Sequence, residues 1–116
     1  MIRVHVALDA RLLREAIGDS LRRAESLIVV SLSAEGAEGT AAVQETRPDV
    51  VVFALPRSEE PSAWVTAYRE AAPGTRVILL AFSRRTDEFS GCGADAVVDA
   101  GDGVDELIAA IHAVAD

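Results

Sequence analysis

The sequence predicts an α/β fold in which five parallel strands alternate with helices on both faces of one sheet. Three observations lead to this prediction. Short runs rich in Val, Leu and Ile recur along the 116-residue chain. Segments whose apolar residues follow the spacing of a helix separate these runs. Some runs lack polar alternation, which is typical of parallel strands buried on both faces. The length fits a single domain over residues 1–116.

The first half of the chain contains two predicted strands and two predicted helices. Residues 2–8 alternate between apolar and other residues and form the first strand. A helix is expected over residues 11–23, with its inner face formed by Leu12, Leu13, Ala16, Ile17 and Leu21. Residues 27–32 form the second strand. A short alanine-rich helix then ends before Arg47, because the residue before a proline disfavours helical backbone.

The second half contains the other three strands. Residues 50–55 are an unbroken apolar run that ends at Pro56, residues 76–82 form the fourth strand, and residues 96–98 form the fifth. Between them, a helix containing Trp64 and Tyr68 ends at Pro73-Gly74. Residues 83–92 leave room for two helical turns or fewer. The last helix is expected to have Asp102 as its N-cap and an apolar face of Val104, Leu107, Ile108, Ile111 and Val114.

Composition excludes several classes of function. The net charge of −8 argues against direct binding of nucleic acid or of an anionic membrane. Cys92 is the only cysteine, so no internal disulfide forms and a reducing cytoplasm is the expected setting. The sequence shows no signal peptide and no apolar run long enough to span a membrane. His5 and His112 lie in unrelated segments, which favours structural roles over metal binding.

Right-handed crossovers leave few topologies for such a sheet, and the strand order 2-1-3-4-5 is our prediction. Ligands of doubly wound sheets bind beyond the carboxyl ends of the strands, at the point where the strand order reverses. The residues expected at this edge are Leu8, Asp9, Ala54, Leu55, Pro56, Ala81, Ser83, Asp99 and Ala100.

An ordered series of short motifs resembles the flavodoxin-like, CheY-like receiver domains of response regulators, above all those that precede a LuxR/NarL-type DNA-binding domain. The resemblance spans residues 2–114. It rests on Ile2-Arg3-Val4 through Asp9, Leu13-Arg14-Glu15, Arg47-Pro48-Asp49-Val50-Val51, Pro73-Gly74-Thr75-Arg76-Val77-Ile78, Gly93-Ala94-Asp95 and Asp105-Glu106-Leu107 with Ala109-Ala110-Ile111. It implies a shortened fourth helix in the segment before Gly93.

The resemblance also implies a site at which most of the functional residues have been replaced. Receivers use two acids after the first strand for Mg²⁺, an aspartate as phosphoacceptor, a Thr or Ser, and a Lys. The corresponding positions here are Leu8 with Asp9, then Ala54, Ala81 and Ala100, and Val97 stands where many members have a switching aromatic residue. One carboxylate is a poor Mg²⁺ site, and alanine has no nucleophile. We therefore expect a pseudo-receiver with no catalytic residues, no metal and no cofactor.

Two functions are compatible with this sequence. The first is a phosphorylation-independent signalling module of a transcriptional regulator, which is not an enzyme and acts by dimerisation or by contact with a partner. Its expected homodimer face includes Arg14, Ala110 and Ala113 of the first and last helices, and a DNA-binding output domain could follow Asp116. The alternative is a small-molecule sensor that uses the emptied apolar pocket.

Some residues have two open interpretations. Asp9 is either a functional residue, as a remnant metal ligand or an anchor for a ligand amine, or a carboxylate that caps the next helix or faces water. The floor formed by Leu8, Ala54, Ala81 and Ala100 is either an apolar ligand site or a densely packed, collapsed one. Residues 35–40 faintly resemble a phosphate-binding loop, but two acids favour a plain loop. Arg84-Arg85 are either a solvated pair of charges or residues that bind an anion or an acidic partner.

Overall fold

The computed structural model describes residues 1–54, 60–82, 89 and 91–115. It confirms a five-stranded sheet in the order β2-β1-β3-β4-β5. All four neighbouring pairs are parallel. The strands are β1 (Ile2–Ala7), β2 (Leu27–Ser33), β3 (Val50–Phe53), β4 (Arg76–Ala81) and β5 (Ala96–Asp99).

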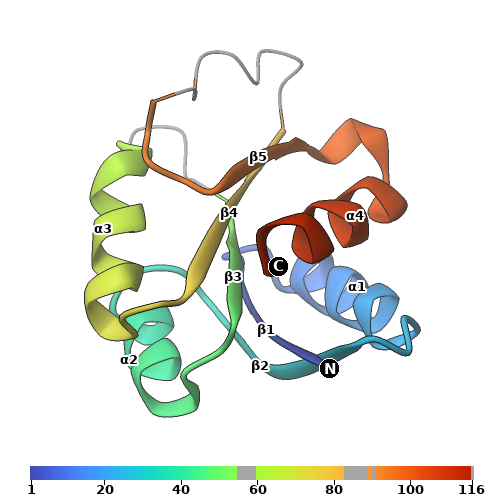
Figure 1. Cartoon of the computed structure of the whole chain (residues 1–116), viewed down its shortest axis with the longest axis horizontal. Coiled ribbons are helices and arrows are strands. Elements are labelled where there is room, and N and C mark those ends of the chain that lie inside the picture. Colours follow the sequence, from blue (N-terminus) through green and yellow to red (C-terminus); the bar gives the residue numbers. More distant parts are fainter. Residues whose placement is uncertain (55–59, 83–88, 90, 116) are drawn as a thin grey trace.

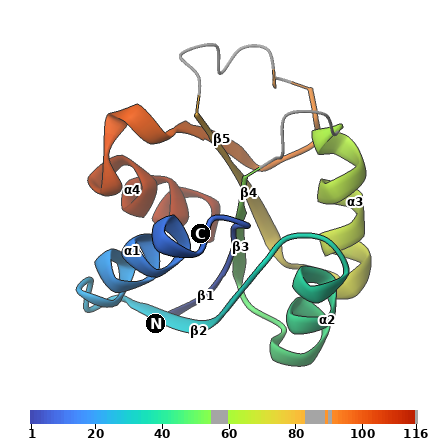
Figure 2. The same ribbon diagram turned by 180° about the vertical axis from the view of Figure 1, so that it is seen from behind.

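Within the described residues, four α-helices cover the two faces of the sheet (Figure 1). They are α1 (Arg11–Arg22), α2 (Ala37–Thr46), α3 (Pro61–Ala71) and α4 (Val104–Ala115). The helices α1 and α4 lie on one face, and α2 and α3 lie on the other, as the reverse view in Figure 2 also shows. The expected strand residue Leu55 and most of the expected short segment 83–92 lie outside the described residues. Residues 82, 89 and 91–95, which are described, contain no α-helix.

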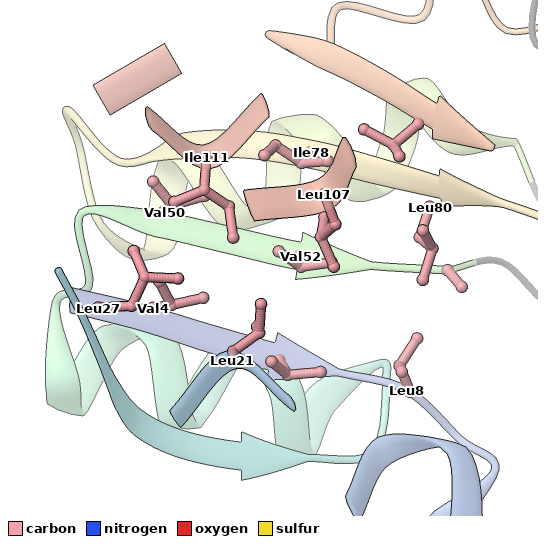
Figure 3. Close-up of a cluster of buried hydrophobic side chains, with 13 residues drawn as sticks. Val4, Leu8, Leu21, Leu27, Val50, Val52, Ile78, Leu80, Leu107 and Ile111 are labelled. Atoms are coloured by element: carbon pink, nitrogen blue, oxygen red, sulfur yellow. The ribbon is translucent and has the colours of Figure 1, made fainter. Parts of the chain in front are cut away.

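The core divides into one apolar cluster on each face of the sheet. Val50 and Val52 of β3 join the cluster under α1 and α4, whereas Val51 and Phe53 join the cluster under α2 and α3. This division explains the unbroken apolar run in the sequence, because both faces of a central parallel strand are covered. Figure 3 shows Leu107 and Ile111 of α4 over Val50, Val52 and Ile78.

The predicted inner face of the first helix is partly wrong. Leu12 is 83% exposed and Ala16 is also exposed, whereas Leu21 is buried. Leu13 and Ile17 pack beside Leu21, because residues four apart share one side of a helix. The helix approaches β2 closely at Gly18, where a Cβ atom would lie 3.0 Å from Cδ2 of Leu32.

The predicted N-cap of the last helix is also wrong. Asp102 ends a 3₁₀ turn, Ala100–Asp102, and Gly103 separates this turn from α4. Asp99 caps the 3₁₀ turn rather than α4, because its Oδ1 accepts a 2.8 Å hydrogen bond from the N–H of Gly101. Asp105 and Glu106 do lie in the first turn of α4, where negative charge favours the helix dipole.

None of the helices in the described part of the chain is long and apolar enough to cross a lipid bilayer.

Candidate functional site

The carboxyl ends of the central strands form the edge at which the sequence predicts a site. Leu8 and Asp9 follow β1, Ala54 follows β3, Ala81 ends β4, and Ala100 begins the turn after β5. Because these strands are parallel neighbours, their ends lie at the same edge of the sheet. Leu55, Pro56, Ser83 and Arg84-Arg85 were also expected near this edge and lie outside the described residues.

This edge is closed by apolar packing. Leu8 is 2% exposed, Ala54 5% and Ala81 4%. Leu8 and Ala54 belong to the cluster that α1 and α4 cover. In Figure 3 the side chains of Leu8 and Leu80 lie at the carboxyl ends of their strands. This burial favours the collapsed interpretation of the site over an open pocket floored by these residues.

The remaining two replaced positions pack on opposite faces of the sheet. Ala100 packs partly buried against the cluster of α1 and α4, and Val97 packs partly buried against the cluster of α2 and α3. Ala100 also lines a hollow of about 160 Å³ between α1 and α4, together with Leu13, Ile17, Phe82, Val104 and other residues.

Asp9 does not cap the next helix. The N-cap position of α1 is Ala10, which makes no side-chain capping bond. Asp9 Oδ1 instead accepts a 2.8 Å hydrogen bond from the backbone N–H of Glu35, in the loop between β2 and α2. Its carboxylate therefore joins the loop after β1 to the loop after β2.

Glu35 is a site residue that the sequence did not single out. Its Oε1 is buried and has no hydrogen-bond partner among the described residues. Burial, and then the negative charge of Asp9, raises the pKa of Glu35 to about 8. A carboxyl group in this environment holds its proton at neutral pH, so Asp9 and Glu35 together carry less negative charge than two free carboxylates.

Tyr68 of α3 is fully buried, and its hydroxyl also has no hydrogen-bond partner among the described residues. Burial raises the pKa of Tyr68 well above its ordinary value, and the charges of Glu35 and Asp9 raise it further. A Cβ atom at Gly39 would lie 3.0 Å from the Tyr68 hydroxyl, so glycine leaves room for the ring. The two glycines of residues 35–40 were the only sequence signal of this close approach.

His5 lies beneath the same loop, in the layer under α2 and α3. It is fully buried, and its Nδ1 and Nε2 bond to the hydroxyls of Ser31 and Ser33, the latter at 2.9 Å. Ser33 donates its own proton to the carbonyl oxygen of Ala34 at 2.8 Å. Ser33 must therefore accept from Nε2–H, which leaves Nδ1 to accept from Ser31. Burial lowers the pKa of His5 to about 4.

The structure changes the predicted dimer face. Arg14 is half-buried, and its Nη1 donates a 2.9 Å hydrogen bond to the carbonyl oxygen of Leu8. Ala110 is partly buried and packs against the core cluster of α1 and α4, whereas Ala113 is exposed. Of the three residues, only Ala113 lies on the outer surface of α4.

In the described part of the chain, no group of three or more His, Cys, Asp or Glu side chains is placed to hold a metal ion. Asp9 and Glu35 form one carboxyl pair. Because Glu35 is protonated at neutral pH, this pair attracts a cation less strongly than two carboxylates would.

The architecture and this edge define the class of fold: the chain has the receiver fold of response regulators. A DNA-binding response regulator of the LuxR family from Staphylococcus aureus matches it with a TM-score of 0.86 at 18% identity, over 100% of both chains. The signal receiver domain of NarL from Mycobacterium tuberculosis matches with a TM-score of 0.84 at 23% identity, over 98% of this chain and 95% of that one.

A two-component response regulator of the LuxR family from Aurantimonas sp. SI85-9A1 matches with a TM-score of 0.85 at 23% identity, over 99% of this chain and 85% of that one. The sequence matches no protein-family model, and a search of curated proteins found no match. These similarities establish the fold.

Proposed function

We propose that this chain is a receiver-like signalling module whose output does not depend on phosphorylation. The observation that carries the proposal is Ala54, which stands at the phosphoacceptor position and is 5% exposed. A methyl group has no lone pair with which to attack a phosphoryl donor. The proposal therefore assigns the chain no phosphoryl transfer and no other enzymatic reaction.

The neighbours of Ala54 support the same conclusion. Leu8 fills its position with a buried side chain, and Ala81 and Ala100 have no group that could bind a phosphoryl oxygen or neutralise its charge. Mg²⁺ requires several oxygen ligands in octahedral geometry, and Asp9 is the sole carboxylate left at the family's positions.

Output then depends on a surface that is present without activation. We propose a homodimer through the outer surfaces of α1 and α4. The side chains on these surfaces are complementary in charge, because Arg22 and Arg23 end α1 whereas Asp105 and Glu106 begin α4. Arg23 has no side-chain partner among the described residues and lines a hollow of about 330 Å³ with Asp105. In a two-fold dimer, each contact between α1 of one copy and α4 of the other occurs twice.

The setting that suits this module is a cytoplasmic transcriptional regulator. One of the similar structures is a DNA-binding response regulator. The net charge of −8 makes this domain unsuited to binding DNA itself. We therefore assign DNA binding to an output domain or a partner protein.

Sedimentation velocity tests this function directly. The chain is measured over a range of micromolar concentrations, with and without a small phosphodonor and Mg²⁺. The proposal predicts a concentration-dependent dimer whose dissociation constant does not change with phosphodonor. A dimer that forms only with phosphodonor would contradict phosphorylation-independent output.

Small-molecule sensing is the second candidate function. It is favoured by the hollow of about 160 Å³ that Ala100 lines between α1 and α4. This volume is below the roughly 300–1,000 Å³ of usual ligand pockets, so its ligand would be small and apolar. Thermal melting against a panel of small apolar metabolites tests this function, because a ligand that binds only the folded state must raise its stability.

A further inference from the structure

We propose that the chain binds a small multivalent oxyanion at the amino-terminal edge of its sheet, at the end opposite to the emptied phosphorylation site. A hollow of about 490 Å³ opens there between the end of α2 and the start of β4. Its lining includes Arg47, Arg76, Thr75, Pro48 and Asp49. The volume lies within the range of small-molecule sites.

Two guanidinium groups that have no partner among the described residues line this hollow. All 11 cationic side chains of the chain are arginines, and most of the described ones are already engaged. Arg11, Arg22 and Arg69 form ion pairs, and Arg3 and Arg14 donate to backbone carbonyls. Within the described residues, the guanidinium groups of Arg23, Arg47 and Arg76 make no hydrogen bond or ion pair, and two of these three line the same hollow.

The rim of the hollow is held in place by hydrogen bonds. Arg3 donates to the carbonyl oxygens of Thr46 and Arg47 at 2.8 and 2.9 Å, which fixes the end of α2. Thr75 Oγ1 donates to the carbonyl oxygen of Pro48 at 2.9 Å, which joins the start of β4 to the start of β3. A site fixed before binding loses less conformational entropy when its ligand arrives.

The backbone of Arg47 adds a second constraint. Its φ of 46° lies in the left-handed region, and Arg47 is the only described residue other than glycine with positive φ. This conformation closes α2, because the N–H of Arg47 donates to the carbonyl oxygen of Val43. Pro48 follows with its own fixed φ. The start of the Arg47 side chain is therefore fixed at the rim.

The chemistry of the lining selects the ligand. Guanidinium groups bind phosphate and carboxylate oxygens through paired N–H donors. Asp49 also lines the hollow, and its negative charge repels an anionic ligand. Its Oδ2 accepts a 2.9 Å hydrogen bond from the N–H of Arg3. An anion with more than one charged group, such as a diphosphate or a tricarboxylate, offers oxygens to both arginines.

Isothermal titration at constant ionic strength tests the site, with inorganic pyrophosphate as the phosphate probe and citrate as the carboxylate probe. Arg47→Asn removes one guanidinium with a residue that tolerates positive φ, and Arg76→Gln removes the other. Arg11→Gln is the matched control, because Arg11 is an exposed arginine on α1 paired with Glu15. We expect saturable binding of at least one probe, weakened about tenfold by each site variant and unchanged in the control.

Asp49→Asn tests independently whether the ligand is an anion. The amide oxygen of this variant can still accept from the N–H of Arg3, but the negative charge of Asp49 is removed. We expect this variant to bind the same probe about threefold more tightly. The absence of saturable binding by either probe, equal weakening in Arg11→Gln, or unchanged affinity in Arg47→Asn and Arg76→Gln would each overturn the site. All of these substitutions are at exposed positions.

Discussion

The backbone N–H of Glu35 donates a 2.8 Å hydrogen bond to Oδ1 of Asp9, and this bond joins the loops after β1 and β2. Asp9 is the one carboxylate among the positions at which the resemblance to receiver domains implies functional residues, and here it bonds to the loop that leads into α2. Its position follows from the strand order, because β1 and β2 are adjacent parallel strands whose carboxyl ends coincide.

The Glu35 carboxyl should titrate near pH 8. Since the pKa of Glu35 is about 8 and its ordinary value is 4.5, protonated Glu35 stabilises the fold. This contribution is complete below pH 4.5 and is lost as pH rises through 8. Carbon-13 NMR of the Glu35 carboxyl should follow this titration, and Asp9→Asn should lower its midpoint.

Stability measurements provide the control for Glu35. Urea unfolding of Glu35→Gln should lack the loss of stability between pH 5 and 8 that wild type shows. Glu70→Gln, at an exposed glutamate of α3, should behave like wild type. A midpoint for Glu35 below pH 5 would show that this carboxyl is not held in its protonated form.

His5 should give a pH dependence of the opposite sign. Its folded-state pKa of about 4 lies below the ordinary 6.5, so neutral His5 stabilises the fold above pH 6.5. This contribution is lost as pH falls from 6.5 through 4 and amounts to at most about 3 kcal/mol. Urea unfolding of His5→Gln at pH 7 and pH 4 should show correspondingly less acid destabilisation.

His112→Gln is the matched control for His5. Its partner is the Ser26 hydroxyl at 2.8 Å, and His112 is half-buried near the end of α4. This variant should keep the acid sensitivity of wild type. A proton NMR titration of the His5 ring in wild type provides a second readout, and a midpoint near 6.5 would contradict the account.

Magnesium should not bind detectably. Millimolar Mg²⁺ should leave the melting temperature and Trp64 fluorescence unchanged, since Leu8 and Ala54 supply no ligands. Combining Leu8→Asp with Ala54→Asp should lower the free energy of unfolding by more than about 2 kcal/mol, because a buried leucine is lost and carboxylates are desolvated. A saturable Mg²⁺ response that disappears in Asp9→Ala would show that Asp9 still binds the ion.

The dimer surface is tested at Ala113. Ala113→Arg should weaken self-association more than tenfold in sedimentation, because it adds bulk and charge to the exposed side of α4. Ala41→Arg, at an exposed alanine of α2, should leave association unchanged. Ala110→Arg should instead lower the melting temperature, since Ala110 packs against the core. A monomer at all accessible concentrations would remove the homodimer.

The sequence allowed the sheet and the position of the site to be predicted, because hydrophobic periodicity and chain order determine both. The unbroken run at Val50–Phe53 correctly indicated a central strand, and Leu8, Ala54, Ala81 and Ala100 do follow or end the strands expected. Helix faces were less predictable. Leu12 and Leu13 are both apolar, but Leu13 packs inward beside Ile17 and Leu21, whereas Leu12 is 83% exposed.

The polar interactions near the site could not be predicted from spacing. Glu35 and Tyr68 are far apart in the sequence, and their proximity depends on how the loop after β2 packs against α3. The hydrogen bond from Arg14 to the carbonyl oxygen of Leu8 could not be predicted either, because it depends on the turn between β1 and α1. Asp102 is suited to capping by residue type, but it ends a 3₁₀ turn, and Gly103 separates that turn from α4.

The most direct test of phosphorylation-independent function is intact-mass spectrometry after incubation with a small phosphodonor and Mg²⁺. The resemblance to receiver domains implies that Ala54 stands at the phosphoacceptor position, and its methyl group has no nucleophilic atom, so the proposed function predicts a mass spectrum identical to that of the untreated chain. A stoichiometric, acid-labile adduct with the mass of one phosphoryl group would contradict it.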